Sequence, residues 1–205
     1  MTSVAELVVR SAVEPWRRLG LQVLDDVAVV GGITLRFVPD DRVVPGGGGL
    51  ISWGLTGPEE VAGDIDGLPT HTATPPRAAV PEHPLGIAGW DHLVVMTSSL
   101  ERTCAALEAA TGAPLKRIRE AGAVRQGFHR MGELVIEVVE TAQVTSPTAS
   151  FWGFVWNVHD LDAVCDRLGP ELVTPPKPAV QPGRRIATVR SAAGVGIPLA
   201  LMTPP

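Results

Sequence analysis

The sequence predicts an α+β fold that arose by internal duplication. Two kinds of observation support this prediction. Several segments recur about 100 residues later, and others repeat the same order of a strand, a helix and two or three strands. Self-similarity of this kind is typical of an architecture built from repeated units. The recurring pairs are GGITLRFV (31–38) with MGELVIEVV (131–139), Trp53-Gly54 with Trp152-Gly153, and TPPR (74–77) with TPPK (174–177); AELVV (5–9) pairs with DHLVV (91–95) at a shorter offset.

The clearest unit runs from 88 to 142. Its apolar run from Trp90 to Met96 predicts a strand. A helix should follow, because Ser98 and Glu101 have capping-box spacing and apolar residues then recur at helical intervals up to Gly112. Two β-rich runs, 125–131 and 134–140, are separated by Gly132-Glu133 and predict a hairpin.

The segment from 148 to 203 repeats that order. It begins with a predicted strand, 151–158, and continues with a helix that Asp160 caps and Gly169 ends. The proline-rich stretch 174–182 reads as an extended loop. Two further strands are predicted at 185–190 and 197–202.

The N-terminal half shows the same order in abbreviated form. It predicts strands at 6–9, 27–30, 33–38 and 50–55, a short helix around Trp16, and a possible second helix containing Val61 and Ile65. Residues 69–87 are rich in proline and histidine and lack a strand pattern, which suggests a linker. We therefore expect an abbreviated domain over 1–85 and a domain of two modules over 86–205.

Composition excludes several classes of function. The chain has 45% hydrophobic residues, enough for a core, and no apolar run long enough to span a membrane or serve as a secretory signal. The net charge of −5 and the lack of aromatics interleaved with basic pairs argue against nucleic acid as a partner. We expect a cytoplasmic protein in which Cys104 and Cys165 are free and buried on helical apolar stripes.

Five segments in order carry a family resemblance: DHLVV, LERTCAALEAATG, GELVIEVVE, WGFVWNVHDLDAVCDRLG and RRIATVRSAAGVGIPLALM. Over about residues 88–203 the chain resembles the glyoxalase-like members of the vicinal oxygen chelate superfamily. The resemblance implies tandem βαβββ modules that form curved mixed sheets around a cavity, which in many members holds a divalent metal. It says more about architecture than about chemistry.

The resemblance places the four metal-ligand positions at His92, Glu137, Phe154 and Pro198. Phenylalanine and proline side chains cannot ligate, so a tightly bound metal is disfavoured, with His92 and Glu137 as weak candidates. The corresponding N-terminal positions are Glu6, Arg36 and Leu55, with the fourth in the linker; Arg36 would repel a cation. His129 and His159 are interpreted as surface or capping residues. No cofactor is expected.

Strand alternation predicts what surrounds these positions. Trp152 and Trp156 should share a face with Phe154, Met202 should share one with Pro198, and Trp90 and Met96 should flank His92. The result is either a largely apolar ligand pocket or an ordinary packed core. Arg125 and Arg185 could supply positive charge at the rim.

Two functions remain open. The first is the binding of a small apolar or aromatic molecule, without chemistry, by stacking on the aromatic side chains. Alternatively, the protein is a lyase or isomerase in which His92 and Glu137 transfer protons beside a carbonyl, with the carboxyl pKa raised by apolar surroundings. A metal-dependent glyoxalase or dioxygenase is the activity that the sequence contradicts most directly. Either a monomer or a homodimer fits, and Trp16 and Trp53 lie at the internal seam between the halves or in ordinary core.

Overall fold

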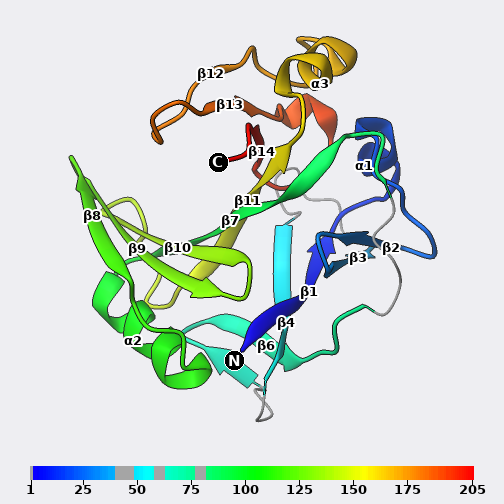
Figure 1. The fold of residues 1–205 in the computed structure, drawn as a ribbon. Helices are drawn as coiled ribbons and strands as arrows, with labels where there is room; N and C mark the ends of the chain where they lie inside the picture. Colours follow the sequence, from blue (N-terminus) through cyan, green and yellow to red (C-terminus); the bar gives the residue numbers. More distant parts are fainter. Residues whose placement is uncertain (1, 40–48, 58–62, 77–81) are drawn as a thin grey trace.

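The fold consists of two curved mixed β-sheets that pack against each other (Figure 1). The computed structural model describes residues 2–39, 49–57, 63–76 and 82–205. Within these ranges, residues before 73 form one sheet and residues from 87 onward form the other. The α+β class and the duplicated architecture are therefore as the sequence predicts.

The N-terminal sheet has six strands in the described residues, in the order β2-β3-β1-β4-β6-β5. The short helix α1 (Glu14–Leu19) follows β1, as expected around Trp16. The strands are β1 (Ser3–Arg10), β2 (Val27–Val30), β3 (Ile33–Val38), β4 (Gly49–Thr56), β5 (Gly63–Ile65) and β6 (Leu68–Thr72).

The C-terminal sheet has eight strands in the described residues, in the order β8-β9-β10-β7-β11-β14-β13-β12. Without its outer strands β8 and β12, this order matches the N-terminal sheet strand for strand. The N-terminal sheet is thus the abbreviated repeat. The elements are β7 (Ile87–Thr97), α2 (Leu100–Thr111), β8 (Arg117–Ala121), β9 (Val124–Met131), β10 (Leu134–Thr141), β11 (Ser150–Val158), α3 (Leu161–Leu168), β12 (Lys177–Pro178), β13 (Arg185–Thr188), a 3₁₀ turn (Ser191–Ala193) and β14 (Leu199–Met202).

Strand register shows which residues of the two sheets are equivalent. In the parallel pair β1–β3, Glu6 pairs with Thr34, and in the parallel pair β7–β10, His92 pairs with Val135. Glu6 and His92 therefore hold the same place in their sheets. Arg36 and Glu137 each lie two residues beyond the paired residue, so they also correspond. This is the equivalence that the sequence repeat indicates.

The helix boundaries are largely those that the sequence predicts, with one correction. Asp160 caps α3 by accepting a hydrogen bond from the Ala163 backbone, and Gly112 ends α2 in the left-handed conformation at φ 69°. The N-cap of α2, however, is Ser99 and not Ser98. The Ser98 hydroxyl instead donates to the Ser146 carbonyl at 2.6 Å, so it is committed to the loop before β11.

The prediction for 61–87 is wrong in two places. Ile65 belongs to strand β5 and not to a helix, whereas Val61 lies outside the described residues. Residues 68–72, which read partly as linker, form strand β6. Pro69 interrupts the apolar pattern, but β6 still gains a parallel partner in β4 and an antiparallel partner in β5. Tertiary pairing overrides the weak local pattern here.

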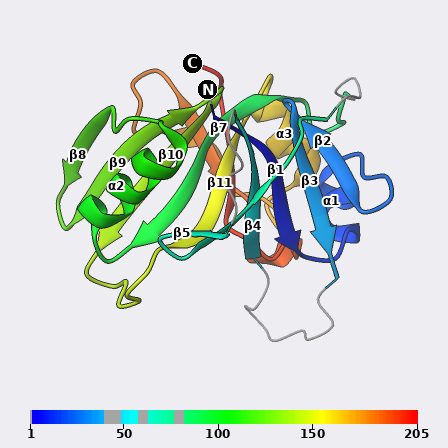
Figure 2. The ribbon, with the colours of Figure 1, turned by 90° about the horizontal axis from the view of Figure 1, so that it is seen from below.

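Aromatic side chains fill the junction between the two sheets, where β11 lies beside β4 (Figure 2). Trp16 of α1 contacts the rings of Phe37, Phe154 and Trp156, with centroids 5.2, 6.3 and 6.0 Å away. Trp53 of β4 meets Phe151 of β11 edge-on at 5.3 Å. Both Trp16 and Trp53 are fully buried, so the seam between the halves is itself hydrophobic core.

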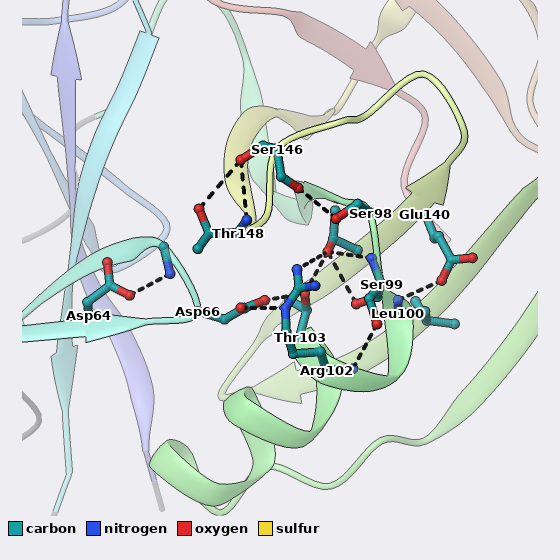
Figure 3. A network of polar contacts seen from close by, with 12 residues as sticks. Asp64, Asp66, Ser98, Ser99, Leu100, Arg102, Thr103, Glu140, Ser146 and Thr148 are labelled. Carbon is teal, nitrogen blue, oxygen red and sulfur yellow. Dashed lines mark hydrogen bonds and ion pairs between the residues drawn. The ribbon is translucent and has the colours of Figure 1, made fainter.

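A polar network joins the same two sheets at another point (Figure 3). Asp66, in the turn between β5 and β6, accepts hydrogen bonds from Nε of Arg102 at 2.7 Å and from the Thr103 hydroxyl. Its backbone carbonyl accepts from the Ala149 amide at 2.7 Å. The carboxylate lies at the N-terminal turn of α2, where a negative charge is favoured.

Cys104 and Cys165 are free and buried, as expected. Burial raises the pKa of the Cys104 thiol to about 11. Of the helices that the structure describes, none is both long and apolar enough to cross a membrane.

Candidate functional site

The curved face of the C-terminal sheet carries three adjoining cavities, and all three are lined by His92 and Glu137. Their volumes are about 580, 520 and 460 Å³. We call this region the cleft; β8 lies at one of its rims and the β12–β13 hairpin at the other (Figure 1). A further cavity of about 530 Å³ lies at the end of α2 and includes neither residue.

A β-bulge in β7 places two neighbouring residues on the cleft side. His92 pairs with Val155 of β11, but the next pair is Trp90 with Trp156, so Asp91 has no residue opposite it. Neighbours in a regular strand point to opposite faces, and a bulge removes this constraint locally. As a result, Oδ1 of Asp91 accepts a hydrogen bond from Nδ1 of His92 at 2.6 Å.

The other ring nitrogen of His92 faces a second carboxylate. Nε2 lies 3.2 Å from Oε2 of Glu137, whose other oxygen accepts a hydrogen bond from the amide of Gln126. On the other side of Asp91, the Arg184 guanidinium donates to Oδ2 of Asp91 at 2.6 Å and to the Thr203 carbonyl. Five side chains thus form one continuous network: Arg184, Asp91, His92, Glu137 and Gln126.

These groups are shielded from water but still reach the cleft. The side chains of Arg184, Asp91 and Glu137 are 11%, 11% and 12% exposed, and that of His92 is 16% exposed. Burial opposes ionisation of Asp91, but hydrogen bonds and charges from His92 and Arg184 outweigh it and hold the pKa of Asp91 below its ordinary value of 3.8. Asp91 therefore stays ionised near neutral pH.

A second bulge, in β11, changes which aromatic residues face the cleft. Phe151 pairs with Val95 and Gly153 with Val94, so Trp152 is the extra residue. The bulge puts Val155 directly across from His92, while Phe154 pairs with the buried Leu93. Phe154 and Trp156 share a face of β11, as expected, but the bulge separates Trp152 from them. Their common face is the core side, where the Phe154 ring packs against Trp16, Trp90 and Trp156, although Phe154 also borders the cleft.

Five of the other predicted pocket residues line the cleft. Met96, Trp152 and Pro198 line the cavity of about 520 Å³, and Trp90 and Met202 line the adjoining ones. Trp90 does so mainly from the core, because its ring nitrogen donates to the Val30 carbonyl and its ring packs on Phe154 and Trp156.

Three predicted residues lie elsewhere. Trp156 is fully buried in the aromatic junction and lines none of the cavities found in the described residues. Arg125 and Arg185, expected at the rim, are also absent from those linings. They point instead to acidic partners on the helices: Arg125 lies 2.7 Å from Glu101, and Arg185 lies 2.6 Å from Asp162.

The donor set does not fit the metal centre that the resemblance implies. His92 and Glu137 supply two ligands, but Val155 and Ala200, which complete the same row across β11 and β14, supply none. Pro198 supplies none either. In the ranges that the structure describes, no three His, Cys, Asp or Glu side chains converge to hold a metal ion.

His129 and His159 do not complete such a set. His159 is exposed, as expected. His129 was expected near the surface and is instead 1% exposed, with Nδ1 2.9 Å from the Ala113 carbonyl. It lies on β9 next to Phe128, on the opposite face of the strand from the cleft.

The equivalent place in the N-terminal sheet holds a different polar cluster. Glu6 forms an ion pair with Arg36 and a hydrogen bond with His71, both at 2.8 Å. His71 lies on β6, in the stretch that the sequence suggested was linker. Gly54 of β4 lies between them, because it pairs with Glu6 on one side and with His71 on the other. A Cβ at Gly54 would come within 2.8 Å of Nε2 of His71. The glycine leaves the space through which Glu6 reaches His71.

Sequence reasoning missed Asp91, Arg184 and the cleft-facing Val155. The bulges explain Asp91 and Val155, because they shift the register without leaving a recognisable pattern of residues. Arg184 lies in the loop before β13, and only the fold brings it to Asp91.

Comparison with known proteins gives weak likenesses. No family model and no curated protein matches the chain. Among solved structures, methylmalonyl-CoA epimerase from Mycobacterium tuberculosis is 16% identical with a TM-score of 0.49, over 58% of this chain and 90% of that one. A variant of the Streptomyces coelicolor methylmalonyl-CoA epimerase in complex with 2-nitronate-propionyl-CoA is 17% identical with a TM-score of 0.47, over 57% and 97%. A hypothetical protein from Bacillus halodurans is 15% identical with a TM-score of 0.47, over 57% and 94%. Likenesses of this strength say nothing about substrate or reaction, and the fold assignment depends on the sheet topology alone.

Proposed function

We propose that the protein is an isomerase or lyase in which His92 and Glu137 move a proton beside a substrate carbonyl, without a metal ion. The observation that carries the proposal is the arrangement of His92: Asp91 holds its Nδ1, and its Nε2 lies in the cleft 3.2 Å from Glu137. An imidazole oriented by a carboxylate on one side and free to react on the other is a common form of general acid–base group.

The hydrogen bonds around His92 indicate where its protons lie. An ionised Asp91 can only accept, so Nδ1 of His92 carries a proton. The contact between Nε2 and Oε2 of Glu137 then holds one further proton between the two groups. Gln126 donates to the other oxygen of Glu137. One member of the pair can therefore accept a proton from a carbon next to a carbonyl while the other returns one to the substrate.

The neighbouring residues suit this role. Val94, Val139 and Val155 line the cavity beside the pair and lower the polarity of its surroundings. Low polarity strengthens electrostatic interactions with a developing enolate, and it reduces proton exchange with solvent. The pair is supported from both sides, by Arg184 through Asp91 and by Gln126.

A direct test follows the exchange of protons next to a carbonyl. Small ketones and keto acids are incubated with the protein in deuterated water, and loss of the α-proton signal is measured by NMR. We expect catalysed exchange for at least one compound, and a drop of about 10²-fold or more in His92→Ala and in Glu137→Gln. His159→Ala is the matched control, because His159 is exposed at the start of α3. Equal exchange in all four proteins would refute the proposal.

A second function, binding of an aromatic molecule without chemistry, is favoured by one specific observation. Trp152 is 50% exposed and borders a cavity whose other walls include Met96, Val139 and Pro198. An exposed indole over an apolar cavity is suited to stacking. If this is the function, an aromatic ligand should quench tryptophan emission and raise the melting temperature. Trp152→Ala should abolish the quenching. Neither the wild type nor any of the variants should catalyse α-proton exchange.

A further inference from the structure

The outer wall of the cleft is formed by strand β8, which carries two arginines on its cleft side. Arg117 pairs with Phe128, which in turn pairs with Glu137, and Arg119 pairs with Gln126. Residues directly opposite in adjacent strands point to the same face. Arg117 and Arg119 therefore face the same side as the catalytic pair, and both line the cavity of about 460 Å³ together with His92 and Glu137.

These two arginines differ from the other arginines of the cleft in having no acidic partner. Arg184 pairs with Asp91 at 2.6 Å, and Arg130 pairs with Glu133 at 3.2 Å. Across the described ranges, neither Arg117 nor Arg119 forms a salt bridge or a side-chain hydrogen bond. The cavity that they share with Glu137 thus has two guanidinium groups for one carboxylate, which already interacts with His92.

The position of Arg117 is fixed by its neighbour. Its guanidinium carbon lies 4.5 Å above the centre of the Phe128 ring. This cation–π contact engages the aromatic ring and no hydrogen-bond acceptor, so the N–H groups of Arg117 are left for other partners. A planar group held in this way matches the two oxygens of a carboxylate or phosphate.

The distance between Arg117 and Glu137 defines the size of a molecule that could touch both residues. Two strand spacings separate Arg117 from Glu137 in their common row, which corresponds to about 10 Å between backbones. The long arginine side chain shortens the gap that a ligand must bridge. A small molecule in the cavity can therefore reach His92 with one end and Arg117 with the other.

We infer that Arg117 and Arg119 form an anion-binding subsite, so that the substrate is a small carbonyl compound carrying a carboxylate or a phosphate. The inference depends on the proposed function for the carbonyl part, whereas the anion subsite stands on the geometry of β8. The anionic group binds the two arginines, and the carbonyl lies beside His92 and Glu137.

Binding is measured first, by calorimetry, with pairs of probes that share a carbonyl skeleton and of which only one member is an anion. Levulinate is compared with its methyl ester, and dihydroxyacetone phosphate with dihydroxyacetone, so that the two pairs distinguish carboxylate from phosphate. We expect the anion of at least one pair to bind about tenfold or more tightly than its neutral counterpart, with the preference lost in Arg117→Gln/Arg119→Gln. Lys116→Gln is the control, because it removes a neighbouring charge that lines the cavity at the end of α2 instead.

The α-proton exchange assay then separates the two proposals. If anions bind through Arg117 and Arg119 but no probe exchanges its protons, the subsite stands and the catalytic proposal fails. If exchange occurs equally for neutral and anionic probes and is unchanged in the double variant, the subsite is refuted and catalysis stands. Absence of any charge preference in binding, or an equal loss of it in Lys116→Gln, also overturns the subsite.

Discussion

Glu6 and His92 occupy the same position in the two sheets of this chain. Each lies on the first strand of its sheet and interacts with the residue at the corresponding position of the parallel strand: Glu6 with Arg36 at 2.8 Å, and His92 with Glu137 at 3.2 Å. One copy thus has a guanidinium–carboxylate ion pair at this position, and the other has an imidazole beside a carboxylate. Three adjoining cavities are lined by the C-terminal pair.

The register of β11 can be tested with two of its aromatic residues, Phe154 and Trp152. Phe154→Ala should lower the free energy of unfolding by about 3–5 kcal/mol, because Phe154 is 1% exposed and packs on three tryptophans. Trp152→Ala should cost well below about 1 kcal/mol, since its side chain is half exposed. Urea unfolding measures both. The reverse order would show that the bulge at Trp152 is misplaced.

Gly54 should resist substitution in the N-terminal sheet. A Cβ at this position would lie 2.5 Å from Cβ of Ala73 and 2.8 Å from Nε2 of His71. Gly54→Ala should therefore cost about 1–3 kcal/mol of stability, because these neighbours must shift. Gly49→Ala on the same strand is the control, since a Cβ there meets no atom within 4 Å. Similar unfolding midpoints for the two variants would contradict this packing.

The Asp66 network should contribute to the joining of the two sheets. Asp66→Asn preserves shape and tolerates the left-handed backbone at φ 51°, but it removes the charge that binds Arg102 and Thr103. We expect a loss of about 1–3 kcal/mol in urea unfolding, because polar groups in the junction lose their partner. Asp25→Asn is the matched control: Asp25 is also left-handed, at φ 47°, and it is exposed. A loss no greater than that of the control would mean that the network is dispensable.

Asp91 should make stability dependent on acid pH. Its pKa in the folded protein lies below the ordinary value of 3.8, so the folded state binds fewer protons than the unfolded state as the pH falls through this range. The stabilisation is present above that ordinary value and is lost as the pH falls through the folded pKa. Asp91→Asn should therefore be less stable than the wild type at pH 7, and the difference should stay constant as the pH falls until it nears the ordinary pKa of 3.8, and shrink below that value. Urea unfolding across this pH range measures it, and a difference independent of pH would contradict the assignment.

The same variant bears on the proposed chemistry. Without the Asp91 carboxylate, His92 loses the group that fixes its Nδ1 proton, so α-proton exchange should fall by about tenfold or more while the fold persists. The control is Asp162→Asn, because Asp162 is a mostly exposed carboxylate on α3 that pairs with Arg185. Unchanged exchange in Asp91→Asn would mean that Asp91 does not position the imidazole.

The sequence by itself determined the duplicated α+β architecture, the helix ends at Gly112 and Gly169, and the correspondence of Glu6 with His92 and of Arg36 with Glu137. These follow from hydrophobic periodicity, capping chemistry and self-similarity, which are local properties that a sequence displays directly. The tertiary structure alone decided which side chains meet in the cleft. Two bulges shift the register, one by placing Asp91 on the same face as His92 and the other by exchanging Phe154 for Val155. A bulge depends on how two strands fit each other. Arg117, Arg119 and Arg184 reach the cleft because strands and loops that are distant in the sequence fold around it. No short segment of sequence therefore encodes the meeting of these side chains.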